Sequence, residues 1–274
     1  MPPCGEFSRA SPGGIACRGH GIGQAMNRES IYGRQAVREV LRAGRRTAFV
    51  LQLADSARAQ GPLEEILTLV RKKNIRVEKV PPAVLDRLGG NHQGVALQAD
   101  EYPLAPLEEI LTRAEAAGPE ALLLILDQIQ DPQNLASLLR TAEAAGVHGV
   151  ILPLRRAAGV TPAVVNASAG AVEHLAIAQA NLAQAIEEIK RRGIWVAGLD
   201  ADSAGESLLE ADLKGPLALV IGSEGEGLRP LVRKSCDRLL RLPMRGRIES
   251  LNAAAAGSIA LYLVLQQRLK SNPA

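Results

Sequence analysis

Apolar residues in the first hundred positions follow the short, mixed spacings of a small α/β unit. Within the segment 33–43, Val37, Val40 and Leu41 fall at positions i, i+3 and i+4, the spacing of one helical face. Other segments predict strands at 47–53, 76–80 and 94–98 and a second amphipathic helix at 63–73. We therefore expect a compact α/β domain over residues 27–99.

The pattern changes at Ala121, where apolar runs become continuous. The run ALLLIL at 121–126 is typical of a strand buried on both faces of a parallel sheet. Further strands are expected at 147–152, 175–178, 194–198, 217–221 and 238–242, and helices at 131–145, 162–172, 182–192 and 251–269. This alternation predicts an α/β domain over 120–274, with a parallel sheet covered by helices on both faces.

Two stretches lack a strong apolar period. Residues 1–26 are rich in glycine, proline and serine, and we expect them to form a disordered N-terminal extension. Residues 100–119 hold two early prolines and an acidic helical segment, and we interpret them as the linker between the two domains.

Positive charge is concentrated in two parts of a chain whose formal net charge is only +3. Arginine-rich segments at 28–46 and 229–247 suggest a polyanionic partner. Aromatic residues make up only 2% of the 274 residues. Stacking of bases on aromatic side chains is therefore not expected to be the main mode of contact.

The sequence also bears on compartment and metal chemistry. No apolar run approaches the ~20 residues of a membrane helix, and no secretory signal is recognisable at the N-terminus. The cysteines Cys4, Cys17 and Cys236 lie far apart without a CxxC pair. We expect a cytoplasmic protein without a metal site.

The segment 127–146, DQIQDPQNLASLLRTAEAAG, is the first with polar residues placed for chemistry. Asn134 lies just beyond the end of a buried strand, and Arg140 follows six residues later. Apolar residues at 135, 138, 139 and 142 already supply a buried helix face, so Arg140 is free to point elsewhere. Its head group is expected to reach the carboxyl edge of the sheet, where ligands of α/β proteins bind. The alternative is an ordinary surface arginine.

The second segment, LALVIGSEGEGLRP at 217–230, places Gly222, Gly225 and Gly227 after a buried strand. Glycines let the backbone approach a ligand closely. The loop is no Walker motif, because Leu228 and Arg229 follow Gly227. A dinucleotide loop would instead follow the first strand of the domain. The alternative is a tight turn in which Glu224 caps the next helix.

The third segment, 239–267, joins a strand to a long helix. Ser250 and Asn252 are natural N-cap residues for that helix. The run Ala253–Ala256 and Gly257 give its first turns an unusually small surface, which favours close backbone packing. Plain helix packing is the alternative interpretation.

Taken in this order, the three segments resemble the SpoU (TrmH) branch of the SPOUT methyltransferases. The resemblance is carried by Asn134 and Arg140, by GSEGEGL at 222–228 and by LPMRGRIESLNAAAAG at 242–257. Two N-terminal stretches, IYGRQAVREVLRAGRR and NHQGVALQADEY, resemble the substrate-binding domain of RlmB-type enzymes. Departures are mild: alanines stand at 253–256 where relatives often have a Val-Ser-Val run, and Gln133 replaces the usual Gly or His.

The resemblance implies a parallel-sheet SPOUT domain whose C-terminal part forms a deep trefoil knot. It implies that the preceding small α/β domain is similar to a ribosomal protein and binds RNA. It further implies S-adenosylmethionine as methyl donor, no metal, and a homodimer whose site is assembled at the subunit interface. The positions matching the cofactor site are Ile221, Gly222, Leu242, Met244 and Leu251, and those matching the catalytic set are Asn134, Arg140, Glu224, Ser250 and Asn252.

The implied reaction is methylation of a ribose 2′-hydroxyl in RNA. A guanosine of large-subunit (23S) rRNA is the expected target and tRNA is the alternative; neither DNA nor a membrane is expected as a partner. The hydroxyl must lose its proton near the transition state. The family assigns this activation to the position of Arg140, but a guanidinium stays protonated at ordinary pH. We expect Arg140 to grip the neighbouring phosphate and polarise the hydroxyl, with Glu224 or Ser250 completing the proton path.

Two other functional classes stay open at this point. One is an RNA-binding protein without catalysis, against which the complete set of polar motif residues argues. The other is a nucleotide-binding dehydrogenase or hydrolase, which the missing early glycine-rich loop disfavours. Binding of the methyl donor would discriminate between these classes.

Overall fold

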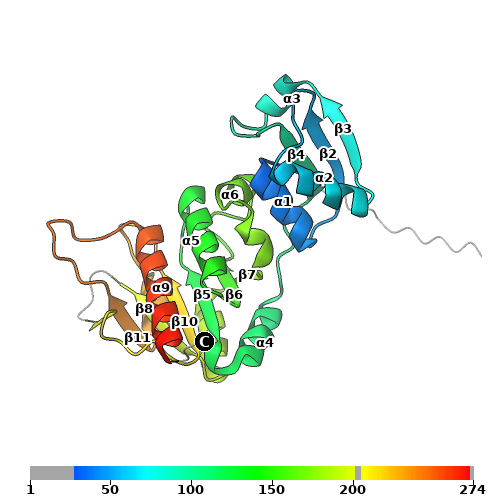
Figure 1. Ribbon diagram of the computed structural model, residues 1–274. Coiled ribbons are helices and arrows are strands. Elements are labelled where there is room, and N and C mark those ends of the chain that lie inside the picture. Colours follow the sequence, from blue (N-terminus) through cyan, green and yellow to red (C-terminus); the bar gives the residue numbers. More distant parts are fainter. Residues whose placement is uncertain (1–27, 201–204, 272–274) are drawn as a thin grey trace, which may run out of the picture.

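The chain forms two sheets of different size, each with its own helices (Figure 1). The computed structural model describes residues 28–200 and 205–271. The extension expected at residues 1–26 lies outside these described residues.

The N-terminal sheet has the strand order β1-β4-β2-β3. Its strands are β1 (Arg28–Tyr32), β2 (Ala48–Ala54), β3 (Arg76–Val80) and β4 (Val95–Asp100), and its helices are α1 (Arg34–Ala43), α2 (Pro62–Lys72) and α3 (Pro82–Asp86). The strand β4 is antiparallel to β1 and β2, whereas β2 and β3 are parallel. The apolar face foreseen for α1 is buried. The strand β1 and the short helix α3 were not expected from the sequence.

The C-terminal sheet is wholly parallel, in the order β7-β6-β5-β10-β8-β11-β9. Its strands are β5 (Leu122–Leu126), β6 (Gly149–Pro153), β7 (Ile177–Ala180), β8 (Trp195–Leu199), β9 (Glu206–Ser207), β10 (Leu217–Ile221) and β11 (Arg238–Arg241). Every residue of the neighbouring strands β5 and β10 is buried. The continuous apolar runs in the sequence therefore correspond to strands covered on both faces, as predicted.

Successive residues of β5 and β10 point to opposite faces, and a different set of helices covers each face. One face packs against α5 (Pro132–Ala144), α6 (Pro162–Ala167) and α9 (Ala253–Ser271). The other packs against α4 (Leu107–Ala117), α7 (Leu182–Arg191) and α8 (Pro230–Ser235).

The structure refines two helical stretches. The acidic helical segment expected in the linker is the helix α4, which also packs on β6 and β7 and buries Ile110 and Leu111. The single helix expected over 162–172 is α6 followed by the 3₁₀ turn η2 (Ala171–His174). Ala169 and Gly170 separate them with φ values of 54° and 83°, a left-handed conformation that ends a helix.

The two units are packed together rather than merely tethered. The helix α1 lies against η2 and α6, and β1 also contacts α6 (Figure 1). Apolar residues from both sides of this contact belong to one continuous buried cluster. The arrangement of one unit is therefore coupled to that of the other.

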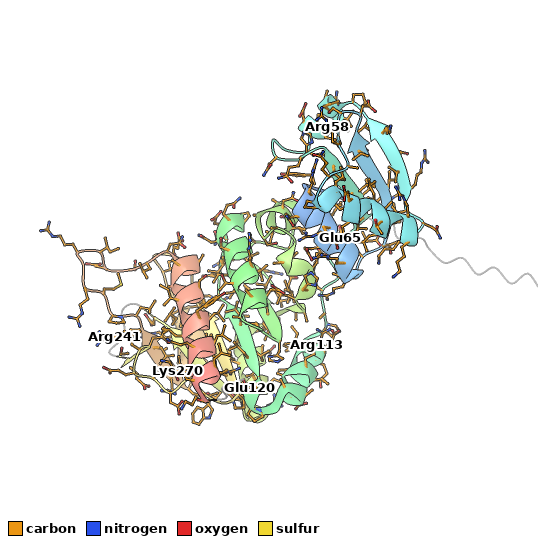
Figure 2. The ribbon with its side chains drawn as sticks, viewed as in Figure 1. Arg58, Glu65, Arg113, Glu120, Arg241 and Lys270 are labelled. Atoms are coloured by element: carbon orange, nitrogen blue, oxygen red, sulfur yellow. The ribbon has the colours of Figure 1, made fainter. Side chains whose placement is uncertain are left out.

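Arg268, near the end of α9, joins this helix to the amino-terminal edge of the sheet. Its guanidinium donates to the carbonyl oxygens of Glu120, Ala121 and Gly215 at 2.5, 2.9 and 2.7 Å. We expect Arg268→Ala to lower the free energy of unfolding by about 2–4 kcal/mol, because these carbonyls lose a charged donor. Urea unfolding measures the change. Lys270→Ala, an exposed position of the same helix (Figure 2), is the control and should stay within about 0.5 kcal/mol of the parent. Equal effects of the two variants would contradict this role of Arg268.

Candidate active site

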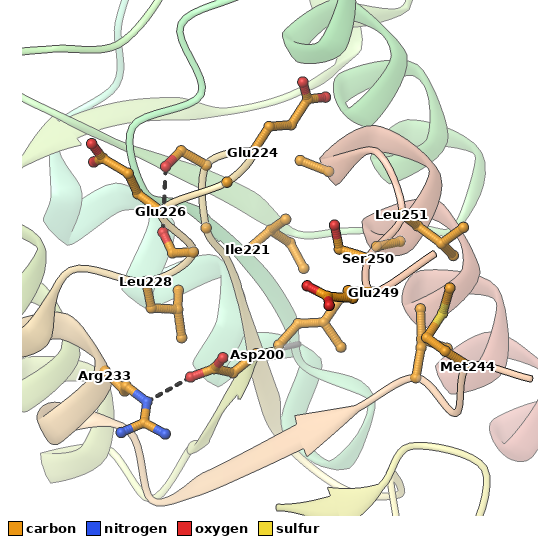
Figure 3. Close-up of a pocket in the computed structure, with 18 residues that line it drawn as sticks. Asp200, Ile221, Glu224, Glu226, Leu228, Arg233, Met244, Glu249, Ser250 and Leu251 are labelled. Atoms are coloured by element: carbon orange, nitrogen blue, oxygen red, sulfur yellow. Dashed lines mark hydrogen bonds and ion pairs between the residues drawn. The ribbon is translucent and has the colours of Figure 1, made fainter. Parts of the chain in front are cut away.

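A cavity of 440 Å³ opens at the carboxyl ends of β8, β10 and β11 (Figure 3). Ligands of parallel α/β sheets bind at this edge, because loops and helix N-termini converge there. Its walls come from three stretches of chain: the end of β8, the loop after β10 and the segment between β11 and α9. The lining includes Leu199, Asp200, Ile221, Gly222, Leu228, Leu242, Met244, Ser250 and Leu251.

The glycine-rich loop after β10 is a tight turn. Ser223 and Gly227 exchange two backbone hydrogen bonds of 3.1 Å, which places Glu224 and Glu226 near the tip of the turn (Figure 3). A Cβ atom at Gly222 would lie 2.3 Å from the carbonyl carbon of Gly227. No other residue fits at position 222 without moving the loop, so the glycine is required by close backbone approach.

Glu224 brings the three sequence motifs together. Its Oε1 accepts hydrogen bonds from the side-chain amides of Asn134, at 2.8 Å, and of Asn252. The amide of Asn252 also donates to Oδ1 of Asn134 at 3.0 Å. The alternative in which Glu224 caps the following helix is wrong, because α8 begins after Arg229 and has no side-chain cap.

Both asparagines are held in place by helix starts. Asn252 caps α9, since its Oδ1 accepts the backbone N–H groups of Ala254 and Ala255 at 2.9 and 3.1 Å. With its oxygen engaged in this way, its amide nitrogen must face Glu224. Asn134 lies in the first turn of α5, where its own N–H bonds to the N-cap Asp131 at 3.1 Å. The positive ends of two helix dipoles therefore flank the Glu224 carboxylate.

Two further carboxylates fix the frame of the cavity. Asp127 is fully buried at the end of β5 and accepts the backbone N–H and Nε of Arg229 at 2.9 and 2.7 Å, which anchors the exit of the glycine loop. Asp200 follows β8 and pairs with Nε of Arg233 at 2.5 Å (Figure 3). The sequence analysis did not single out either residue. Their position directly after a buried strand is the signal that would have found them.

A second hollow, of 640 Å³, adjoins the cavity on the side of α5. Polar residues dominate its walls, among them Gln128, Asp131, Asn134 and Arg156. It shares Ser223, Glu224 and Glu226 with the first cavity. Glu224 therefore stands where the two cavities meet.

The residues selected from the sequence are only partly brought together. All of the positions assigned to the cofactor line the first cavity, as do Glu224 and Ser250. Arg140 differs: it is exposed on α5 and makes no hydrogen bond or ion pair with any residue that the structure describes. One copy of the chain does not direct Arg140 into the cavity.

Several arginines of the two basic segments are engaged inside the protein. In the first, Arg42 pairs with Glu65 at 2.6 Å and Arg46 is buried against Glu173. In the second, Arg238 pairs with Glu206 at 2.5 Å. By contrast, Arg245 and Arg247 lie exposed on the segment before α9. Only part of the positive charge counted in the sequence is therefore free to meet a polyanion.

Across residues 28–200 and 205–271 there is no cluster of His, Cys, Asp and Glu side chains arranged to hold a metal ion. Burial raises the pKa of the Cys236 thiol to about 12, so the thiol stays neutral. Cys4 and Cys17 lie outside the described residues. No helix in the same ranges is long and apolar enough to cross a membrane.

Comparison with known families matches both parts of the chain. Residues 121–262 match the model of the SpoU rRNA Methylase family, and residues 30–105 match the model for RNA 2′-O ribose methyltransferase substrate binding. The Bacillus subtilis protein YacO is 43% identical to this chain over 240 residues, and its name describes it as a TrmH family tRNA/rRNA methyltransferase. The alignment covers 87% of this chain and 95% of the relative.

Solved structures share the fold. The SpoU methyltransferase AviRb of Streptomyces viridochromogenes, determined with S-adenosylmethionine, superposes with a TM-score of 0.74 over 89% of this chain and 91% of its own, at 24% identity. The TrmH/SpoU tRNA-modifying enzyme of A. aeolicus reaches a TM-score of 0.52 at 26% identity. It covers only 60% of this chain, although 85% of its own length is matched.

The asparagine–carboxylate cluster generates a charge-specific prediction. Asn252→Ser and Asn252→Asp both retain a good N-cap, but only the aspartate places a second negative charge against Glu224. At pH 7 we expect the serine variant to lose about 1–3 kcal/mol of stability, and the aspartate variant to lose more. Because Glu224 is exposed, salt screens the repulsion, and the gap between the variants should narrow as the salt concentration rises.

Urea unfolding at low and at high salt concentration measures this gap. A gap that is independent of salt concentration would show that Asn252 does not act through the charge of Glu224.

Proposed function

Because the chain belongs to the SpoU rRNA Methylase family, we propose that it transfers a methyl group from S-adenosylmethionine to a ribose 2′-hydroxyl of RNA, with a guanosine of 23S rRNA as the target. The observation that carries this proposal is the meeting of Asn134, Glu224 and Asn252 at the edge of one cavity. These residues come from three separate motifs and converge where a bound donor and an incoming hydroxyl would meet.

The first cavity suits the methyl donor. Its volume of 440 Å³ falls in the range of small-molecule sites, and its walls combine apolar side chains with free loop backbone. Ile221, Leu242, Met244 and Leu251 would contact the adenosine, and the missing side chain of Gly222 leaves the backbone close to it. The sulfonium of the donor supplies an electrophilic methyl group. Glu224, Glu226 and Glu249 around the same cavity favour a ligand that carries positive charge.

The second hollow suits the acceptor ribose. It adjoins the donor cavity at Glu224 and offers amide and carboxylate groups for hydrogen bonds to hydroxyls. Asn134 and Asn252 both bond to Oε1 of Glu224, which fixes this carboxylate and leaves Oε2 without a donor among the described residues. This arrangement favours Glu224 over Ser250 as the group that receives the hydroxyl proton.

Arg140 enters this scheme through a second copy of the chain. The outer surface of α5 carries Arg140, and the adjacent helix α9 exposes Ile259 and Tyr262 by 41% and 51%. A homodimer built on these helices would cover the apolar side chains and bring Arg140 towards the partner's site. There the guanidinium would hold a phosphate next to the reactive ribose and polarise its hydroxyl.

The N-terminal unit supports the choice of rRNA as the target class. The matched tRNA-modifying enzyme covers 60% of this chain, so a large part of the chain has no counterpart in that enzyme. The match of residues 30–105 to a substrate-binding model supports an RNA target that contacts both units. We keep tRNA as the alternative outcome of the test below. A cytoplasmic location and a trefoil knot around the loops 222–228 and 242–252 belong to the same proposal.

The target is tested by mapping. We expect a strain lacking this protein to lose one 2′-O-methylated guanosine in 23S rRNA, and the purified protein to restore it with S-adenosylmethionine. Primer-extension or mass-spectrometric mapping of rRNA and tRNA identifies the site. A methyl group lost from tRNA alone would move the assignment to the alternative, and no lost ribose methylation in either RNA would contradict the proposed function.

The role of Arg140 is tested by separating chemistry from stability. Because the residue is exposed, Arg140→Ala should change the free energy of unfolding by less than about 1 kcal/mol. Turnover should nevertheless fall by orders of magnitude, since the lost interaction forms mainly in the transition state. Arg140→Lys should restore little of the lost activity, because an ammonium group cannot reproduce the planar pair of donors of the guanidinium. Single-turnover methylation at saturating RNA and donor is the measurement, and a near-normal rate for the alanine variant would make Arg140 a surface arginine.

A further inference from the structure

The contact between the two units contains a fully buried ion pair. Arg46, between α1 and β2, and Glu173, on η2, both have side chains that are 0% exposed. They form a two-pronged contact, with Nη2–Oε1 at 2.7 Å and Nε–Oε2 at 3.1 Å. The third guanidinium nitrogen of Arg46 bonds to Glu29 at 2.6 Å and to the carbonyl oxygen of Asp100 at 3.1 Å. Every nitrogen of this guanidinium is thus engaged at the joint.

The surrounding contacts define one orientation of the joint. A Cβ atom at Gly170 would lie 2.7 Å from Cβ of Glu39 and 3.1 Å from Cα of Ala36, so the backbone before η2 is pressed against α1. His174 contacts Glu39 at 2.9 Å. The hydroxyl of Tyr102, on the connection between the units, donates to the carbonyl oxygen of Leu175 at 2.6 Å.

A planar bidentate pair of this kind specifies direction as well as distance. Sliding or rotating α1 over η2 would leave the buried Glu173 carboxylate without its ion-pair partner, which is strongly unfavourable. Arg46 would keep only its bonds to Glu29 and to the carbonyl oxygen of Asp100. A loose tether would need none of these contacts. The extended connection 101–106 alone would keep the units attached.

We propose that the Arg46–Glu173 pair positions the N-terminal unit at a fixed orientation to the catalytic cavity, so that RNA meets one preformed surface made by both units. Arg46 and Glu173 are positioning residues, since they are buried at the joint and touch neither cavity. The inference rests on the proposed function in taking RNA as the ligand.

The expected consequence is a loss of apparent RNA affinity when the joint loosens. If the docked arrangement is populated only a tenth of the time, the apparent Kd for an RNA that needs both units rises about tenfold. The methylation rate at saturating RNA and the affinity for S-adenosylmethionine should stay within about twofold of the parent values. Neither quantity depends on the joint once bound RNA holds the units in the docked arrangement.

The experiment uses the full chain and variants that separate charge, packing and fold. Glu173→Gln removes the charge that Arg46 faces across the joint and leaves Arg46 paired only with Glu29. The double variant Arg46→Met/Glu173→Leu removes both charges from the joint and keeps it apolar and filled, while the partly exposed Glu29 is left to solvent. Glu78→Gln is the matched control, because Glu78 pairs with Arg76 on the same strand, β3.

Filter binding of a 23S rRNA fragment gives the RNA Kd without requiring turnover, and limited proteolysis of the connection 101–106 reports docking. We expect Glu173→Gln to raise the RNA Kd about tenfold and to speed cleavage. The double variant should restore both, and Glu78→Gln should match the parent. Thermal unfolding of the catalytic unit identifies any variant that fails to fold.

The proposal is overturned if Glu173→Gln opens the connection to protease without changing the RNA Kd, because the orientation would then be irrelevant to RNA binding. It is also overturned if the double variant stays docked yet binds RNA as poorly as Glu173→Gln. A parent protein that binds RNA but methylates none would contradict the proposed function and leave the positioning result valid.

Discussion

The carboxylate of Glu224 is the point through which the candidate site is assembled. It accepts hydrogen bonds from Asn134 and Asn252, two asparagines that lie 118 residues apart in the sequence. Each asparagine is tied to the start of a helix, and both helices pack on the same face of the parallel sheet. An anion placed between two helix N-termini is stabilised by both dipoles. The same contacts that hold the glycine loop therefore also hold a charged group at the mouth of the cavity.

A second constraint acts at the contact between the two units. The buried pair of Arg46 and Glu173 lies between the N-terminal unit and η2, where an unpaired charge would be costly. Burial raises the pKa of Glu173, and its hydrogen bonds to Arg46 act against this shift. The pair contributes less to net stability than its short distances suggest, but it excludes other orientations of the two units. The geometry therefore supports a role in fixing how the two units are oriented, rather than in raising the stability of the fold.

The helix α5 connects the cavity to the contact between the two units. Its N-terminal turn carries Asn134 at the cavity, and the body of the helix packs against α6 and η2, which face the N-terminal unit. An RNA that contacts both units would thus lie along elements that pack on the same helix. Arg140, on the exposed side of this helix, is the one member of the expected catalytic set that a single chain does not direct to the cavity.

The sequence by itself determined the architecture of the large unit and most of the cavity lining. Continuous apolar runs separated by helical periods specify a parallel sheet, since only strands covered on both faces need them. The glycines of 222–228 and the polar residues 250 and 252 marked the loops that line the cavity. Tertiary structure decided the rest. The sequence indicated a helical segment in the linker but not the packing of α4 on β6 and β7. Arg42 and Arg46 looked free because Glu65 and Glu173, with which they pair, lie elsewhere in the chain. Periodicity reports which face of an element is buried, whereas the partner of a charge is set by long-range packing that no local pattern records.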